Sequence, residues 1–250
     1  MVLSFEQFEK GVDMQDIDSF LELVKSRRTV RGYQQKEVPQ ECVEKILEAA
    51  RWAPSGGNSQ PWEFVIITDP EMRRRIVELY VKQLEDKREM ERVVRGPKAS
   101  AGSGTGFQHA PVFILVLGDE RVNGAFPIRT YLDKGEQHFT TGLASATLMI
   151  HLAAASLGLG CQWLSDSASP YMATMLKSWL DIPMQLRIYD LVTLGYPTRL
   201  PPAPPRRELS EMVHWGAYDS RKARSDAEIH DFLMKQTRLG NFGRRSEEGT

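Results

Sequence analysis

Two clusters of arginines carry the side chains best suited to an anionic ligand. The early cluster adds a threonine hydroxyl, and the late pair follows a run of prolines; the residues are Arg27, Arg28, Thr29, Arg31, Arg206 and Arg207. Guanidinium groups present forked N–H donors, and the hydroxyl adds another donor, so the set matches the oxygens of a phosphomonoester. A basic pair at a helix end is more often only a solvated partner of the helix dipole. The phosphate interpretation therefore needs support from other segments.

A glycine-rich loop, PSGGNSQPW, offers a second kind of contact between Pro54 and Trp62. Its glycines let the backbone approach a planar ligand closely. The amides of Asn58 and Gln60 carry donors and acceptors that match a pyrimidine edge. Because the same residue types fill ordinary turns between a helix and a strand, the loop alone decides nothing.

Metal and thiol chemistry find little support in the sequence. The histidines have no metal-ligand spacing and are interpreted as core or surface residues; they are His109, His138, His151, His214 and His230. Only Cys42 and Cys161 are present, too few for a disulfide framework, and Cys161 is expected to be a small buried apolar side chain. We therefore predict no metal, no structural disulfide and a cytoplasmic protein.

Composition favours a single soluble domain. The chain has 250 residues, of which 41% are hydrophobic, enough for a full core. The charged side chains number 32 basic and 33 acidic, which gives no reason to expect a nucleic acid as partner. The apolar run 143–164 is interrupted by polar residues and glycines, so it predicts a buried helix and no membrane span. The first residues lack a basic leader and a long apolar stretch, so no signal peptide is expected.

Periodicity predicts the elements that would position these side chains. We expect helices over 17–27, where Asp18 and Ser19 could cap the start, and then over 40–53, 70–95, 140–157 and 169–180. Strands are expected over 62–69, 110–119 and 187–197, with the chain turning into a further strand within 158–166. We expect residues 119–137 to be irregular, 96–109 to be a mobile connection and 197–209 to run extended. Helices and strands do not alternate regularly, which indicates the α+β class.

Several of these segments, in order, resemble the nitroreductase family. The matching stretches are SRRTVRGY, AARWAPSGGNSQPWEFVII, GLGCQWL, LGYP, PPRREL and VHW, which frame residues 20–215. The resemblance implies an α+β, nitroreductase-like fold in which helices flank a central mixed or antiparallel sheet. It also implies an intertwined homodimer with two FMN sites, each held by residues of both subunits.

The resemblance assigns flavin-binding roles residue by residue. Arg27, Arg28, Thr29 and Arg31 match the first phosphate and ring-edge segment, and Arg206 or Arg207 matches the late phosphate ligand. Pro54, Ser55, Gly56, Asn58 and Gln60 match the loop that reaches the flavin from the partner chain. Gln162, Trp163 and Leu164 match the backbone that faces the reactive flavin nitrogen. Gly56 departs from the Ser-Ser common in relatives, which leaves the substrate open.

By this resemblance the chain is expected to take hydride from NADH or NADPH and pass electrons through FMN to a small-molecule acceptor. No protein side chain need be catalytic, because the cofactor carries the redox chemistry. We expect an N-terminal extension over 1–16, an FMN-binding domain over 17–215 with a possible lid within 80–140, and a polar tail over 216–250. Nitroaromatics and quinones are the first candidate acceptors. The alternatives are a reductive dehalogenase or flavin-modifying enzyme on the same fold, and a non-catalytic flavin-binding protein.

Overall fold

The computed structural model describes residues 14–97 and 105–238. These residues form two compact units. The first unit contains residues 14–76 and 106–203. The second contains residues 77–97, Thr105 and 204–238.

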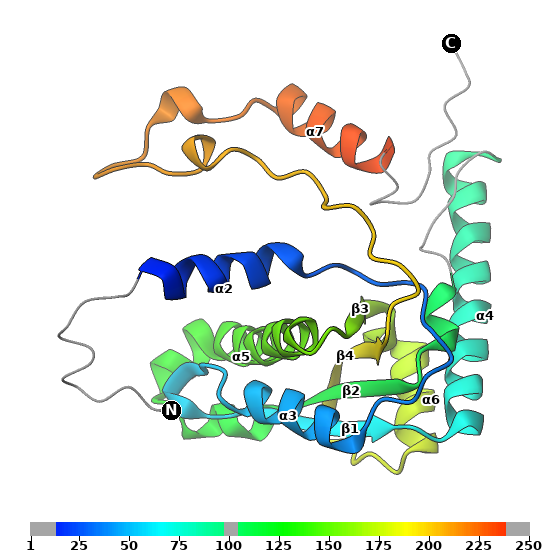
Figure 1. Ribbon diagram of the computed structural model, residues 1–250. Coiled ribbons are helices and arrows are strands. Elements are labelled where there is room, and N and C mark those ends of the chain that lie inside the picture. The colour runs from blue at the N-terminus through cyan, green and yellow to red at the C-terminus, as the bar shows by residue number, and fades with distance from the viewer. Residues whose placement is uncertain (1–13, 98–104, 239–250) are drawn as a thin grey trace. The chain divides into compact units, whose positions relative to one another are not determined.

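A four-stranded antiparallel sheet forms the centre of the first unit (Figure 1). Its strands are β1 (Trp62–Ile67), β2 (Val112–Asp119), β3 (Gly160–Leu164) and β4 (Leu186–Gly195), in the order β1-β2-β4-β3. All three pairings are antiparallel, and the pairing of β2 with β4 contains a bulge at Val116 and Leu117. β2 is buried along nearly all of its length, as its continuous apolar sequence predicts. β3 lies at one edge of the sheet, where its outer backbone groups need another partner.

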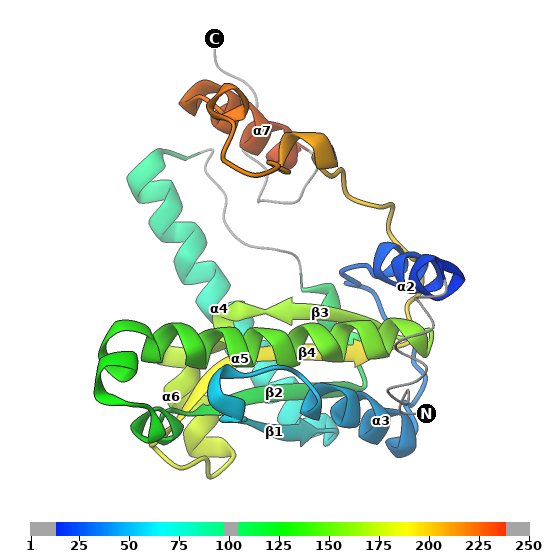
Figure 2. The same cartoon turned by 90° about the vertical axis from the view of Figure 1, so that its left-hand side faces the viewer.

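Helices α3 (Gln40–Arg51) and α5 (Ile128–Ser156) pack together on one face of this sheet (Figure 2). In α3 the buried side chains Val43, Ile46 and Ala50 recur at helical spacing and form one face. They join Ile114 and Val192 from the central strands in a continuous core. Burying side chains of the size of valine or isoleucine contributes about 1.5–3 kcal/mol each to folding.

α5 is the main helix of this core. It is long and apolar enough to cross a membrane by length and composition. However, Phe139, Leu143, Ala146 and Ile150 follow one another at helical spacing, all are buried, and all belong to the core beneath the sheet. α5 is therefore a core helix, as the polar interruptions of its sequence predicted.

Most predicted elements are confirmed, but two helix starts were wrong. α5 begins at Ile128, so residues 128–137 are helical and not irregular. Pro127 precedes its first turn in an extended conformation, and Gly135 lies inside the helix close to the Tyr131 ring. A proline before a helix and a glycine within one were both taken for loop signals. α2 runs from Met14 to Ser26, so Asp18 does not cap its start.

Further segments lie outside the sheet and its two core helices. α6 (Pro170–Trp179) confirms the helix predicted over 169–180. In the expected mobile connection 96–109, residues 98–104 lie outside the described residues, whereas Gly106–His109 form a 3-10 helix, η2, with Phe107 buried against Phe113. After Leu200 the chain continues to Glu208 without helix or strand, as its prolines predict.

The second unit contains most of α4 (Pro70–Arg95) and, near the end of the chain, α7 (Asp226–Arg238). The exposed side of α4 carries ion pairs one turn apart, such as Arg92 with Glu89 and Arg95 with Glu91. Its opposite side buries Tyr80 and Leu84, which confirms the amphipathic helix that the sequence predicted.

Candidate functional site

The early arginine segment runs along the free edge of β3. The amide of Val30 donates a hydrogen bond of 2.9 Å to the carbonyl of Cys161, and Thr29 forms an isolated parallel bridge with the same residue. These contacts occupy edge groups that β4 leaves unpaired. The structure thus brings Arg27–Arg31 beside the GLGCQWL segment, although 130 residues separate Arg31 from Cys161 in the sequence.

Two features fix this alignment. A Cβ on Gly160 would come within 2.4 Å of Val30 Cγ2, so only glycine allows so close an approach. The Tyr33 hydroxyl donates to the carbonyl of Val30 at 2.9 Å and lies 2.8 Å from the Thr193 hydroxyl. Burial raises the pKa of Tyr33 well above its ordinary value, so this group stays a neutral donor.

A cavity of about 230 Å³ lies beside the same segment. It is bounded by the end of α2, the C-terminal half of α5 and the start of β3, with Ser26, Arg27, Arg28, His151 and Cys161 among its lining residues. The Arg28 guanidinium is bound to the main chain, since its Nε donates to the Pro201 carbonyl at 3.1 Å. Ligand sites in proteins usually measure about 300–1,000 Å³, so this cavity holds only part of a cofactor-sized ligand.

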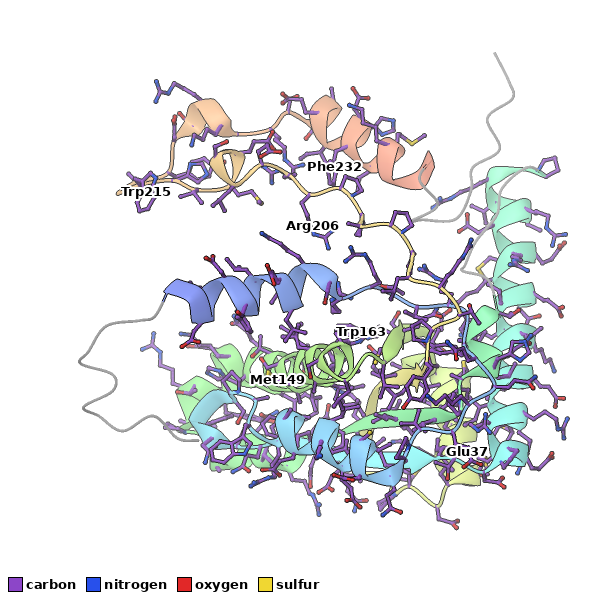
Figure 3. The ribbon with its side chains drawn as sticks, in the orientation of Figure 1. Glu37, Met149, Trp163, Arg206, Trp215 and Phe232 are labelled. Carbon is purple, nitrogen blue, oxygen red and sulfur yellow. The ribbon has the colours of Figure 1, made fainter. Side chains whose placement is uncertain are left out.

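His151 is the histidine of α5 that lines this cavity. Its side chain is 5% exposed, and neither ring nitrogen has a hydrogen-bond partner among the described residues. Burial, and to a smaller extent the charge of Arg27, lowers its pKa to about 4, so the ring is neutral at physiological pH. The ring stacks on that of Trp163, with centroids 6.0 Å apart; Trp163 is labelled in Figure 3. The sequence predicted only a core or surface histidine at position 151, since nothing in its spacing marks a ligand-binding role; its burial makes it a core histidine.

The side chains of the GLGCQWL strand alternate between the two faces of the sheet. Trp163 is 41% exposed on the α5 side, whereas Gln162 and Leu164 are buried. The Gln162 side-chain oxygen also lacks a partner among the described residues. Any contact of Gln162 with a ligand on the α5 side would therefore come from its backbone.

The Pro54–Gln60 loop contains the short helix η1 (Gly56–Asn58). Three of its residues have positive φ: Gly57 at 59°, Asn58 at 52° and Gln60 at 45°. The Ser55 hydroxyl holds the loop closed by accepting a hydrogen bond of 3.0 Å from the main-chain N–H of Gln60. Left-handed non-glycine residues are strained and concentrate at binding sites, which is a physical reason to regard this loop as one.

Within one subunit, however, the loop and the cavity lie near different parts of α5. Ser55 lies close to Gly142, where a Cβ would be 3.3 Å from the serine Cβ. The cavity lies beside His151 and Ala155. A helix rises about 1.5 Å per residue, so the two places are roughly 14–20 Å apart along the helix axis. One subunit does not bring these two groups of predicted flavin ligands together.

The late arginines belong to the second unit. Arg207 pairs with Glu211, with its Nε 3.3 Å from the Glu211 carboxylate, and its side chain is only 23% exposed. Arg206 is exposed and donates a 3.3 Å hydrogen bond to the carbonyl of Pro205 (Figure 3). The two residues therefore differ in how much of their charge a neighbouring carboxylate already balances.

A buried carboxyl group lies on β4, in the first unit. Asp190 is 3% exposed, and burial raises its pKa to about 8 despite a hydrogen bond from the Leu191 amide. The negative charge of Asp166 raises it further. Asp190 is thus a protonated, neutral carboxyl group near neutral pH, which sequence analysis did not identify.

Comparisons with known proteins show what this chain resembles. The family model described as "Nitroreductase family" matches residues 24–196. A protein of Archaeoglobus fulgidus, to which an NADH dehydrogenase or NAD(P)H nitroreductase activity is ascribed, is 28% identical over 72% of this chain and 87% of its own length. Mouse iodotyrosine deiodinase 1 is 29% identical over 72% of this chain and 62% of its own length.

Solved structures have the same fold. A Desulfovibrio desulfuricans protein ascribed to the nitroreductases and solved in complex with FMN has a TM-score of 0.58 and 27% identity, covering 80% of this chain and 97% of its own. An FMN-dependent nitroreductase from Clostridium difficile has a TM-score of 0.60 and 23% identity, covering 79% of this chain and 99% of its own.

Proposed function

Because this chain belongs to the nitroreductase family of FMN-dependent, NAD(P)H-using oxidoreductases, we propose that it reduces a nitroaromatic, a quinone or a similar small acceptor. The observation that carries the proposal is the alignment of Arg27–Arg31 with β3 beside a cavity, inside the region that the family model matches. Bound FMN would supply the chemistry, taking hydride from the nicotinamide and passing electrons to the acceptor in a ping-pong cycle.

The residues around the cavity fit FMN. Arg27 and Arg28 place positive charge along its wall, and His151 adds a buried polar group without a partner. We assign the flavin phosphate to the Arg27, Thr29 and Arg31 segment, where charge-assisted hydrogen bonds would hold it. The backbone of Gln162, Trp163 and Leu164 would face the flavin ring. These residues belong to β3, and the edge of β3 is aligned with the arginine segment through the bridge between Thr29 and Cys161.

The complete site requires a second copy of the chain. The Pro54–Gln60 loop lies too far along α5 to reach the cavity of its own subunit, so we infer that it completes the cavity of a partner in a homodimer. α2 supports this inference, because Phe20, Leu21 and Val24 expose between 39% and 49% of their area. Large exposed apolar side chains gathered on one helix are typical of a protein interface.

Arg206 is the better candidate for the late phosphate ligand. Arg207 is paired with Glu211, so binding a phosphate through it would first break that pair. Among the described residues, Arg206 hydrogen-bonds only a main-chain carbonyl. We therefore assign the phosphate contact to Arg206, within an FMN-binding domain over 17–215 in a cytoplasmic enzyme.

A reductive dehalogenase is the second candidate function. It is favoured by the similarity to iodotyrosine deiodinase 1, which covers 72% of this chain. A lid over the site would lie within residues 80–140, a range that includes the charged C-terminal part of α4. No grip for a halotyrosine is recognisable among these residues in the sequence, which is why nitroaromatics and quinones come first.

Anaerobic titration of the purified protein tests the proposal. NADH and then NADPH are added while the visible flavin spectrum is recorded, and a nitroaromatic, a quinone or a halotyrosine follows. We expect bleaching by a nicotinamide and reoxidation by the nitroaromatic or the quinone. Reoxidation by the halotyrosine with release of halide would select the dehalogenase instead. A flavin that never bleaches would leave a non-catalytic flavin-binding protein.

A further inference from the structure

His151 occupies an environment that the proposed reaction does not explain. It lies on a helix whose neighbouring residues Ile150 and Ala154 belong to the apolar core. Its ring lies at the wall of the cavity, 5% exposed, with both nitrogens unpaired among the described residues. An imidazole needs a partner for one donor and one acceptor when it is neutral.

An unpaired polar group at this depth is costly. Leaving a buried donor or acceptor without a partner destabilises a folded protein by about 1–3 kcal/mol per group. An apolar side chain of similar size at position 151 would avoid this cost and suit the core. The histidine is therefore expected to gain its hydrogen bonds from something that enters the cavity.

The ring is held in a fixed orientation toward the cavity. Trp163 stacks on one side at a 30° interplanar angle, and Trp163 in turn lies 6.2 Å from the Tyr189 ring. This aromatic row limits rotation of the imidazole. Arg27 lines the same cavity, and its charge favours the neutral form of His151. A neutral ring can donate through one nitrogen and accept through the other, which an imidazolium cannot.

We propose that His151 is a flavin-binding residue, whose neutral ring hydrogen-bonds the FMN that enters the cavity beside Arg27. FMN offers phosphate oxygens, ribityl hydroxyls and ring carbonyl and nitrogen groups, so either ring nitrogen of His151 finds a complementary partner. The inference rests on the proposed flavin site and adds to it a residue from the core helix. Histidine at this position then serves cofactor affinity at the expense of the stability of the apoprotein.

Binding of FMN to the apoprotein tests this role without relying on turnover. The affinity is measured by titrating the apoprotein into FMN and following the flavin fluorescence, and apoprotein stability is measured by thermal unfolding. His151→Leu should weaken FMN binding about tenfold, because one hydrogen bond to the flavin is lost and the flavin group that formed it is left without a partner. The same variant should raise the unfolding midpoint of the apoprotein, because leucine has no polar group to bury. His151→Gln, which keeps a polar end, should recover most of the affinity.

Thr147→Val is the matched control. Thr147 is buried on the same helix, but its hydroxyl donates to the Leu143 carbonyl at 2.9 Å and does not line the cavity. This variant should alter stability and leave FMN affinity unchanged. A purely structural His151 would behave in the same way, so unchanged FMN affinity in His151→Leu would overturn the inference.

The proposed flavin site has a separate readout in Arg27→Ala. If Arg27→Ala weakens FMN binding and His151→Leu does not, the flavin site stands and the role of His151 is wrong. If both variants bind FMN as the unmodified protein does, the flavin is held elsewhere and both proposals fail.

Discussion

Gly56 lies directly against the imidazole of His138. A Cβ on Gly56 would stand 2.7 Å from both Cγ and Nδ1 of that ring, nearer than carbon atoms can pack. The next residue, Gly57, is as tightly placed, since its Cβ would lie 2.9 Å from the Phe126 ring. The centroids of the Phe126 and His138 rings are 5.4 Å apart. Phe126, just before α5, and His138, within it, therefore cover the loop and leave no room for side chains at Gly56 and Gly57.

Gly56→Ala should therefore destabilise the protein by about 1–3 kcal/mol, because the added methyl group must displace His138. Urea unfolding of the apoprotein measures the change. In the double variant with His138→Ala the methyl group has room, so most of the loss caused by Gly56→Ala should disappear. If the two substitutions are instead additive, the ring does not restrict position 56.

This contact also limits what could be predicted from the sequence. The glycines of PSGGNSQPW were interpreted as room for a planar ligand, whereas in one subunit they make room for Phe126 and His138. Sequence spacing does not reveal which helix lies over a loop. The packing on this loop arises from contacts between residues far apart in the sequence, Gly57 with Phe126 at 69 positions and Gly56 with His138 at 82 positions.

Local patterns predicted the fold well where they were unambiguous. Every strand of the sheet was anticipated: β1, β2 and β4 from apolar and β-branched runs bounded by turn residues, and β3 from the glycine-containing turn that leads the chain out of the preceding helix. The start of α5 was missed because Pro127 and Gly135 are loop signals on their own. Burial against Tyr131 and the core outweighs the low helix propensity of Gly135.

The buried polar groups were harder to predict than the fold. His151 and Asp190 occur in apolar stretches that predict only a helix and a strand. Their unusual pKa values arise from burial, which depends on the packing of separate elements. Arg27 could be proposed as a phosphate ligand from the sequence, because the chemistry of a guanidinium group is visible in the side chain itself.

Arg27→Ala should weaken FMN binding by about 1.5–3 kcal/mol, roughly tenfold to a hundredfold, through loss of a charge-assisted hydrogen bond. Equilibrium titration of apoprotein with FMN measures the change. Arg129→Ala is the control, because Arg129 is 93% exposed and, among the described residues, forms an ion pair only with Asp133 one turn further along the helix. Equal affinity in the two variants would remove Arg27 from the phosphate site.

A site shared between subunits predicts complementation. Arg27→Ala and Asn58→Ala homodimers should each retain FMN poorly, because every site carries one altered residue. In a mixed dimer, one site carries both substitutions and the other carries neither. We therefore expect tagged mixed dimers to bind one FMN per dimer with the affinity of the unmodified protein. Two weak sites per mixed dimer would show that Arg27 and Asn58 act within one subunit.

Asp190 should make the protein less stable as the pH rises through neutrality. Its folded-state pKa of about 8 lies above the ordinary value of 3.8, so the folded protein holds a proton that the unfolded chain has released. The unfolded state therefore binds fewer protons across this window, and the free energy of unfolding falls as pH rises, by up to about 1.4 kcal/mol per pH unit. At pH values below the ordinary pKa of 3.8, both the folded and the unfolded state hold the proton. There the contribution of Asp190 to the free energy of unfolding has its full value and no longer changes with pH.

Asp190→Asn tests this, because an amide is neutral in both states and has nearly the same shape. Urea unfolding at about pH 7 and about pH 8 should show a loss of stability in the unmodified protein that the variant lacks. This window lies above the pKa of His151, which burial lowers to about 4, so that ring is neutral in the folded protein throughout. Parallel pH dependences in the two proteins would mean that Asp190 is already ionised in the folded state, and that a cation or bound water near it stabilises the charge.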